Sequence, residues 1–173
     1  FVIDEAYHLF GSETAVELIN EFENVIVART FSKGFGVPSI RLGYLLASED
    51  NMSVLSKTRF AHESNALSNS VAEYLLDNYQ IVREYNDKVI HSRETLKIKL
   101  KDLGIKANGN KGNYLLLDLG TKESALKLAE YLKEEIIYVK GPWKKPWEHC
   151  LTITIGPIET MQKFIDSVER FYI

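Results

Sequence analysis

Short apolar runs alternate with amphipathic segments along the chain. The runs at residues 1–3 and 24–28 are apolar on both faces and end at polar residues, which is typical of strands buried within a sheet. Between them, residues 14–22 place apolar side chains at helical spacing, so we expect a helix and parallel pairing of the two strands. Residues 41–48 predict a third strand and residues 69–79 a helix. This half of the chain therefore predicts an α/β layout.

The pattern changes at about residue 80, where a long, charged, amphipathic helix begins that stops at Gly104. Beyond it we expect strands at 114–119, 136–140 and 151–156 and helices at 122–135 and 158–171. The sequence thus predicts two domains. Residues 1–80 form part of an α/β domain with a mostly parallel sheet, and residues 81–173 form a small α+β domain.

Composition narrows the class of protein. The 173 residues are 45% hydrophobic, which is enough to bury a sizeable core. The formal charge of −3 comes without a long run of one sign, so we expect no nucleic-acid partner and no membrane partner. The longest apolar runs fall far short of the roughly 20 residues that a membrane span needs. The single cysteine, Cys150, has no internal disulfide partner, which indicates a reducing compartment such as the cytoplasm.

Two further expectations come from the first residues of the chain and from its histidines. The sequence begins with FVID, in the middle of a strand-like run, and this predicts a piece of a larger protein. The histidines, which are His8, His62, His91 and His149, are scattered without the spacing of metal ligands. We therefore expect no metal site.

The stretch RTFSKGFG at residues 29–36 carries the candidate chemistry. A lysine after a strand is usually a solvated turn residue. Here, however, Asp4 ends the first strand and Lys33 lies just beyond the second. In a parallel sheet both residues lie at the carboxyl edge, where α/β proteins bind ligands. The sequence therefore predicts a ligand site around Asp4 and Lys33.

A phosphate would fit beside this lysine. Thr30 and Ser32 offer hydroxyl donors, and the guanidinium of Arg41, eight residues after Lys33, can bind two phosphate oxygens at once. A lysine amine is a nucleophile towards carbonyls, and the carboxylate of Asp4 suits a protonated pyridine nitrogen. This combination of groups indicates pyridoxal 5'-phosphate.

The two motifs FVIDEAY and RTFSKGFGVPSIRLGY resemble those of the fold type I, or aspartate aminotransferase fold, enzymes that use pyridoxal phosphate. The resemblance covers nearly the whole chain as the C-terminal portion of such an enzyme, and it is closest to the histidinol-phosphate aminotransferase group. It implies a class I/II aminotransferase that acts on a small-molecule amino donor and a carbonyl acceptor, and a homodimer. It also implies that residues 1–80 are the remainder of the cofactor-binding large domain.

The resemblance assigns a role to each matching residue. Asp4 pairs with the pyridine nitrogen, Tyr7 approaches the ring hydroxyl, and Lys33 forms the internal aldimine and afterwards moves protons. The phosphate ligands are Thr30, Ser32 and Arg41. In the small domain, GNYLLLDL matches a strand that carries a substrate-side asparagine, here Asn113.

Two departures from the family pattern change the expectation for activity. The family's upstream phosphate-binding and ring-stacking segments are missing, so we expect the 173 residues alone to be inactive. The family also has an arginine that binds the substrate anion where this chain has Thr152. A substrate without a carboxylate at that end, such as an amino-sugar or amino-alcohol phosphate, is the interpretation we favour. Alternatively, Lys144, Lys145 or an upstream residue supplies the cation.

Other interpretations stay open at this point. Singly, Asp4 can cap a helix, Tyr7 can belong to the core and Arg41 can pair with a surface carboxylate. Trp143 and Trp147 can line a substrate entrance or pack under a loop. The alternative functions are a decarboxylase or lyase relative, and a module that keeps the fold without catalysis. A hydrolase built on Ser32 is disfavoured because nothing supplies an oxyanion hole.

Overall fold

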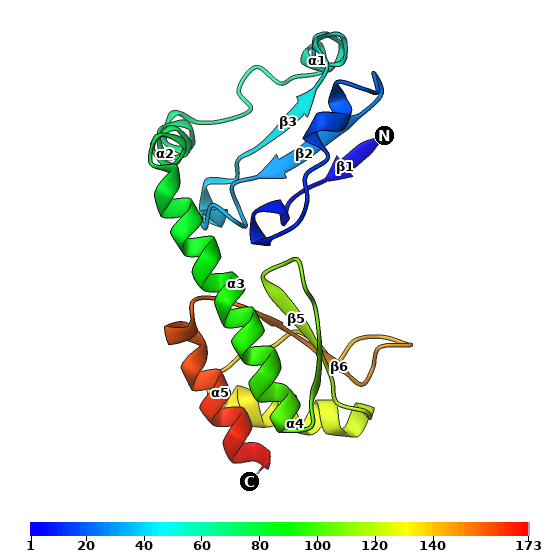
Figure 1. Cartoon of the computed structure of the whole chain (residues 1–173), viewed down its shortest axis with the longest axis vertical. Helices are drawn as coiled ribbons and strands as arrows, with labels where there is room; N and C mark the ends of the chain where they lie inside the picture. The colour runs from blue at the N-terminus through cyan, green and yellow to red at the C-terminus, as the bar shows by residue number, and fades with distance from the viewer. Residues whose placement is uncertain (173) are drawn as a thin grey trace. The chain divides into compact units, whose positions relative to one another are not determined.

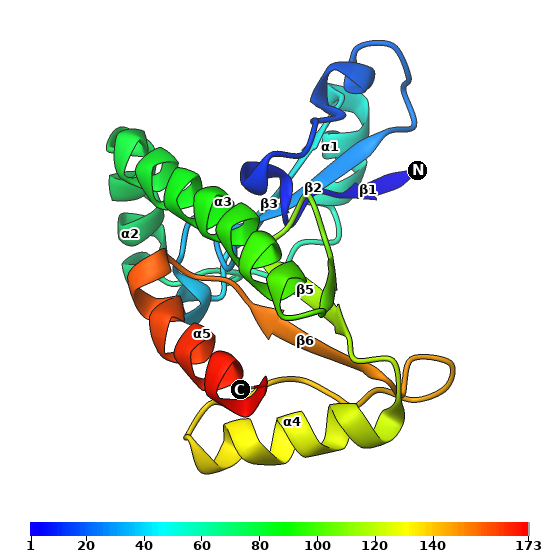
Figure 2. The same ribbon diagram turned by 60° about the horizontal axis from the view of Figure 1, so that its bottom comes forward.

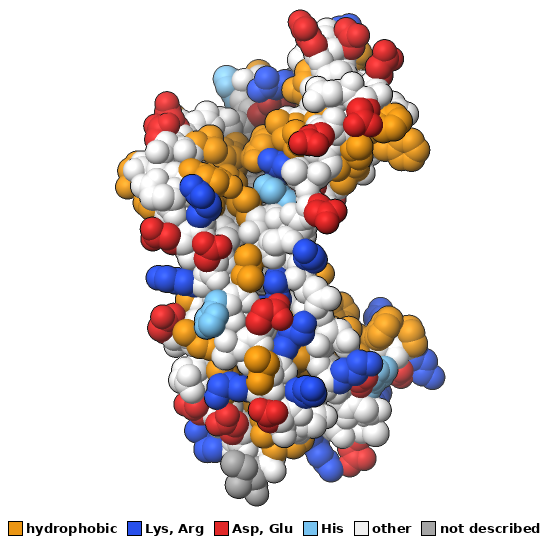
Figure 3. Space-filling model, in the orientation of Figure 1, with side chains coloured by type: hydrophobic (Ala, Val, Ile, Leu, Met, Phe, Trp, Pro, Cys, Tyr) orange, Lys and Arg blue, Asp and Glu red, His pale blue; other side chains and the backbone are white. Residues whose placement is uncertain are grey.

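The computed structural model describes residues 1–172, and the chain divides into two compact units, Phe1–Asn86 and Asp87–Ile173. Each unit contains a three-stranded sheet (Figure 1). On the face of the molecule in Figure 3, basic and acidic side chains are interspersed rather than gathered into a patch of one sign. Within residues 1–172, every helix is too short or too polar to span a bilayer.

The sheet of the first unit has the strand order β1-β2-β3. Strand β1 (Val2–Asp4) pairs in parallel with β2 (Ile26–Thr30), as the sequence predicts, and Asp4 lies opposite Ala28. Strand β3 (Gly43–Ala47) instead runs antiparallel to β2. The connection from β2 to β3 contains only a 3-10 turn at Pro38–Ile40, and a parallel return would need a longer crossover, usually a helix.

Helices of the first unit differ in part from expectation. The helix predicted at residues 14–22 is wrong, because only a 3-10 turn forms at Val16–Ile19. Its apolar side chains Leu18 and Phe22 are exposed, so tertiary packing does not stabilise a longer helix there. Helix α2 (Ala66–Asp77) is present, and α1 (Glu49–Ser56) is an additional helix that the sequence analysis missed.

A small aromatic core fixes the segment that carries Lys33. Phe31 and Phe35 flank the lysine at two positions on either side, and both are buried. Their ring centroids are 4.3 Å apart, and they pack with Ala72 of α2 and Val82 of α3 (Tyr79–Asp102). Burial of the two phenylalanines anchors both ends of the turn, while Lys33 between them remains half-buried.

The second unit is built on an antiparallel sheet of order β4-β5-β6, formed by Lys106–Asn108, Tyr114–Asp118 and Cys150–Thr154. Helices α4 (Lys122–Glu134) and α5 (Ile158–Tyr172) follow β5 and β6 and lie on one side of β6 (Figure 2). The strand predicted at 136–140 is wrong. Ile136 adopts a left-handed φ of 60° where α4 ends, and only Lys140 bridges to Thr152.

Alternation along β5 and β6 separates a buried face from an open face. Leu115, Leu117, Leu151 and Ile153 are buried in the core with the helices. The alternate residues lie on the opposite face, in the directly opposed pairs Tyr114 with Thr154, Leu116 with Thr152, and Asp118 with Cys150. This open face carries Thr152, the position where the family arginine is missing.

Candidate active site

The first unit brings Asp4, Tyr7 and Lys33 to one edge of its sheet. Asp4 ends β1, and Lys33 follows the end of the parallel strand β2, so both lie at the carboxyl edge. The Nζ of Lys33 lies 5.4 Å from the centroid of the Tyr7 ring, within the range of a cation–π contact. The Asp4 Oδ1 accepts a hydrogen bond of 2.9 Å from the Ala6 N–H, which orients an exposed carboxylate.

Ser32 and Arg41 also converge. The Nη1 of Arg41 donates to the Pro38 carbonyl at 3.0 Å and lies 3.5 Å from the Ser32 Oγ. Thr30 has a structural role in the turn, since its Oγ1 accepts from the Ser32 N–H at 3.0 Å and donates to the Leu42 carbonyl at 3.3 Å. A hydroxyl and a guanidinium therefore lie side by side next to Lys33, as anion binding requires.

The backbone of Arg41 is strained. Its φ is 52°, in the left-handed region that residues other than glycine rarely adopt. Such conformations cost on the order of 1 to 3 kcal/mol and cluster at functional sites. The observed strain supports the interpretation that Arg41 is held where it is for binding.

Two features that the sequence analysis did not assign hold the Lys33 turn in place. A Cβ on Gly34 would lie 2.6 Å from the Leu9 Cβ, so only glycine fits this close approach. The buried Asn86, 52 residues away on α3, donates from Nδ2 to the Gly34 carbonyl at 2.8 Å. The available sequence signal was an asparagine on the apolar side of the long helix, near Val82 and Val89.

We expect Asn86→Ala to destabilise the turn that carries Lys33. The Gly34 carbonyl would lose its partner in a buried position, which costs about 1 to 3 kcal/mol in the free energy of unfolding. Urea denaturation of the variant measures this loss. Asn69→Ala, which changes an exposed asparagine on α2, is the matched control. Equal stability of the two variants would contradict the role given to Asn86.

Glu5, the neighbour of Asp4, is buried and stabilises the carboxyl edge of the first sheet through its hydrogen bonds. Its carboxylate accepts from Arg29 Nε at 3.0 Å and from the Ala15 N–H at 2.5 Å, and Arg29 Nη2 lies 2.9 Å away. Thr14 Oγ1 also donates to it at 3.0 Å. Burial raises the pKa of Glu5, but the hydrogen bonds from Ala15, Arg29 and Thr14 outweigh it and hold the pKa below its ordinary value of 4.5.

The substrate-side candidates lie in the second unit. Asn113 precedes β5, and its backbone carbonyl accepts from the Ile155 N–H at 2.7 Å. The Thr152 Oγ1 accepts from the indole Nε1 of Trp143 at 3.1 Å. Lys140, which the sequence analysis did not consider, bonds to the backbone of Thr152 at 2.7 and 3.0 Å, and its Nζ lies 4.5 Å from the Trp143 ring centroid.

These contacts change the choice of candidate cation. Lys140 and Trp143 both contact Thr152, whereas Lys144 and Lys145 lie exposed on the loop that follows. The other tryptophan of this loop, Trp147, lies near His149, with 6.4 Å between the centroids of the two rings. Lys140 became a candidate only through the bridge to Thr152, a pairing between residues 12 positions apart.

The fold and the grouping of residues around Lys33 define a protein of the fold type I class, as the sequence predicts. The family model for aminotransferase class I and II matches residues 1–168, and the chain belongs to this family. The histidinol-phosphate aminotransferase of Thermotoga neapolitana is 30% identical over 169 residues, covering 98% of this chain and 49% of that protein. The histidinol-phosphate aminotransferase of Ruminiclostridium cellulolyticum is 31% identical, and the match covers 96% of this chain and 46% of that protein.

Solved structures show the same fold. The histidinol-phosphate aminotransferase from Sinorhizobium meliloti in complex with pyridoxal-5'-phosphate matches with a TM-score of 0.85 and 24% identity, covering 99% of this chain and 48% of that one. The L-threonine-O-3-phosphate decarboxylase from Porphyromonas gingivalis matches with a TM-score of 0.74 and 24% identity, covering 99% and 54%. The chain thus spans about half the length of the relatives it matches.

Proposed function

We propose that the full-length protein is a pyridoxal-phosphate-dependent aminotransferase of the histidinol-phosphate aminotransferase type. The observation that carries the proposal is the position of Lys33, 5.4 Å from the Tyr7 ring at the sheet edge where Asp4 also lies. The hydroxyl of Ser32, the residue before the lysine, lies 3.5 Å from the Arg41 guanidinium. The substrates are a small-molecule amino donor and a carbonyl acceptor.

The groups present fit this cofactor. Asp4 would hold the protonated ring nitrogen, Tyr7 the ring hydroxyl and Lys33 the aldehyde carbon, with the phosphate held by Ser32 and Arg41. Thr30 would act at the same end through the turn that it shapes. When bound, pyridoxal phosphate supplies an aldehyde that condenses with amines and a ring that withdraws electrons.

The chain's own residues divide the work of the reaction. With cofactor and substrate bound, the Nζ of Lys33 would be the base that removes the proton from the substrate α-carbon and later returns it. Asp4 would keep the proton on the ring nitrogen. Arg41 and Ser32 would hold the phosphate end, which would keep the reacting atoms within reach of Nζ.

An assay of the full-length protein with pyridoxal phosphate, 2-oxoglutarate and a panel of amino substrates tests the proposal. The panel contains histidinol phosphate, amino-sugar phosphates and amino-alcohol phosphates, and glutamate formation is the readout. We expect amino transfer to at least one of them. Release of carbon dioxide from an amino-acid phosphate without glutamate formation would favour a decarboxylase, and no turnover with cofactor bound would favour a non-catalytic module.

Substrate choice depends on the surroundings of Thr152 in this proposal. Threonine cannot replace the charge of the family arginine, and Lys140 is a point charge rather than a planar fork. We expect Lys140→Met to raise KM for the anionic amino substrate about fivefold, or about 1 kcal/mol, and Lys144→Met to leave it unchanged. Conversely, Thr152→Arg should improve turnover of histidinol phosphate. If wild type already uses histidinol phosphate and glutamate well, and neither variant changes KM, the role of this position is refuted.

We also propose that the full-length protein is a homodimer in a reducing compartment, the cytoplasm. Phe60 and Leu67, before and at the start of α2, are 84% and 76% exposed, and contact with a second subunit would bury such apolar side chains. Cys150 is a buried free thiol. Light scattering at micromolar concentration should give the mass of two chains, and an active monomer would contradict the proposal.

The 173 residues by themselves are expected to be inactive. The chain spans about half the length of the relatives it matches. The sequence resemblance implies that the ring-stacking and upstream phosphate-binding segments lie outside these residues. Robust transamination by these residues alone would contradict this expectation.

A further inference from the structure

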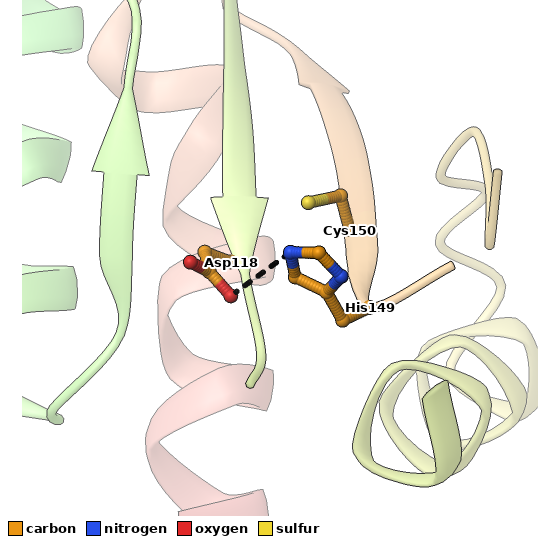
Figure 4. Close-up of side chains that lie close together, drawn as sticks. All are labelled: Asp118, His149 and Cys150. Carbon is orange, nitrogen blue, oxygen red and sulfur yellow. Dashed lines mark ion pairs between the residues drawn. The ribbon is translucent and has the colours of Figure 1, made fainter. Parts of the chain in front are cut away.

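Three different metal-ligating side chains lie close together at one end of the second sheet. Asp118 ends β5 and lies directly opposite Cys150, the first residue of β6. His149 precedes Cys150. Figure 4 shows the imidazole of His149 and the sulfur of Cys150 both directed towards Asp118. The antiparallel register therefore sets the spacing of the cluster.

The backbone around these residues is fixed on both strands. The Leu119 N–H donates to the His149 carbonyl at 3.0 Å, which extends the ladder by one step beyond the Asp118–Cys150 pair. The Gly120 N–H donates to Asp118 Oδ1 at 2.9 Å and orients the carboxylate. Such hydrogen bonds to a ligating carboxylate are typical of the second shell of metal sites.

Distances within the cluster are close to those of a coordination sphere. Asp118 Oδ1 and His149 Nε2 are 3.7 Å apart, and one ligand atom from each of the three residues lies within 4.8 Å of the others. Around tetrahedral Zn²⁺, bond lengths of about 2.0 to 2.3 Å place ligand atoms about 3.3 to 3.6 Å apart. Closing the cluster on an ion therefore requires side-chain rotations that shorten these separations.

The donor set selects the ion. A carboxylate, an imidazole and a thiolate together suit Zn²⁺, which accepts oxygen, nitrogen and sulfur ligands, and they are poor for Mg²⁺ and Ca²⁺, which prefer oxygen. Cys150 is buried, while the side chains of Asp118 and His149 are about one third exposed. The exposed side provides an entry path and room for a water as the fourth ligand.

We propose that Asp118, His149 and Cys150 form a Zn²⁺ site with three protein ligands and one solvent position. On binding, the Cys150 S–H bond breaks, its proton passes to solvent, and the sulfur–zinc bond forms. No redox step is involved. All three ligands belong to the second unit, and Cys150 lies two residues from Thr152 along β6.

Titration of the full-length protein with Zn²⁺ alone and with Co²⁺ alone tests the site. Calorimetry with Zn²⁺ should give one ion per chain, and the Co²⁺ difference spectrum should show a near-ultraviolet thiolate-to-cobalt band. Cys150→Ser should remove the band. His149→Ala, which removes a side chain about one third exposed, should weaken Zn²⁺ binding by at least about 10- to 100-fold. His91→Ala, which removes an exposed histidine of α3, is the matched control.

Each outcome decides the proposal. One Zn²⁺ per chain that is weakened in His149→Ala and unchanged in His91→Ala supports the site. The absence of Zn²⁺ binding, or equal binding in wild type and His149→Ala, overturns it and leaves Asp118 and His149 as an ordinary ion pair. A Co²⁺ band of unchanged intensity in His149→Ala would likewise overturn it, because the thiol alone would then bind the metal.

Discussion

Lys33→Ala is expected to lower kcat for amino transfer by at least about 10²- to 10⁴-fold and to abolish the visible absorption band of lysine-bound cofactor. The magnitude is that of a general base removed from the reacting carbon, and the loss of covalent attachment adds to it. Phe31 and Phe35 hold the turn by burial, so the fold should survive the substitution. Stopped assays and absorbance spectra of the same samples measure both effects.

Two further variants isolate the chemistry of Lys33. Lys33→Arg keeps a positive charge near Tyr7, but a guanidinium does not lose its proton, so this variant should be as inactive as Lys33→Ala. Lys57→Ala removes an exposed lysine at the end of α1 and should have wild-type activity. An absorption band and a turnover that persist in Lys33→Ala would show that the covalent site lies elsewhere.

Glu5→Ala is expected to lower the free energy of unfolding by about 3 to 5 kcal/mol. The substitution leaves the Arg29 guanidinium, 16% exposed, without its carboxylate partner, and an unpaired buried charge is costly. Urea denaturation followed by circular dichroism measures the loss. The double variant Glu5→Met/Arg29→Met removes both charges, so it should be less destabilised than the sum of the single changes. If the losses in the free energy of unfolding of the two single variants add up to that of the double variant, Glu5 and Arg29 are not coupled and the prediction is contradicted.

The same pair predicts a pH dependence. Since the folded-state pKa of Glu5 lies below 4.5, its stabilisation is fully present above that pH and is lost as the pH falls through the folded-state value. Glu5→Gln should therefore show a smaller decline in stability between neutral and acidic pH than wild type. An identical decline in the two proteins would contradict the direction of the pKa shift.

Local motifs predicted which side chains lie at the carboxyl edge of the first sheet. Asp4, Ser32 and Lys33 follow directly from strand ends, and parallel pairing of β1 and β2 brings those ends to one edge. Short-range patterns are reliable there because chain direction alone fixes which side chains meet. The roles of the individual residues stay predictions until variants are measured.

Features that depend on long-range packing were out of reach of the sequence. Asn86 bonds to Gly34 across 52 residues, and Lys140 is placed beside Thr152 by a single bridge. The wrong prediction of a strand at 136–140 also arose because long-range packing cannot be read from the sequence. Its apolar residues Ile136 and Tyr138 are exposed in the structure, so their pattern did not report burial. The cluster of Asp118 with Cys150 depends on strand register, which the sequence does not specify where helix α4 and a long loop separate the two strands.

Borohydride reduction of the cofactor-loaded full-length protein tests directly whether Lys33 is the lysine that binds pyridoxal phosphate. Reduction converts the bond between pyridoxal phosphate and its lysine into a stable secondary amine, and mass spectrometry of peptides then locates it. We expect a phosphopyridoxyl group, at stoichiometric level, on the peptide that contains Ser32, Lys33 and Gly34. A group on another lysine, or none in protein that has been saturated with cofactor, would contradict it.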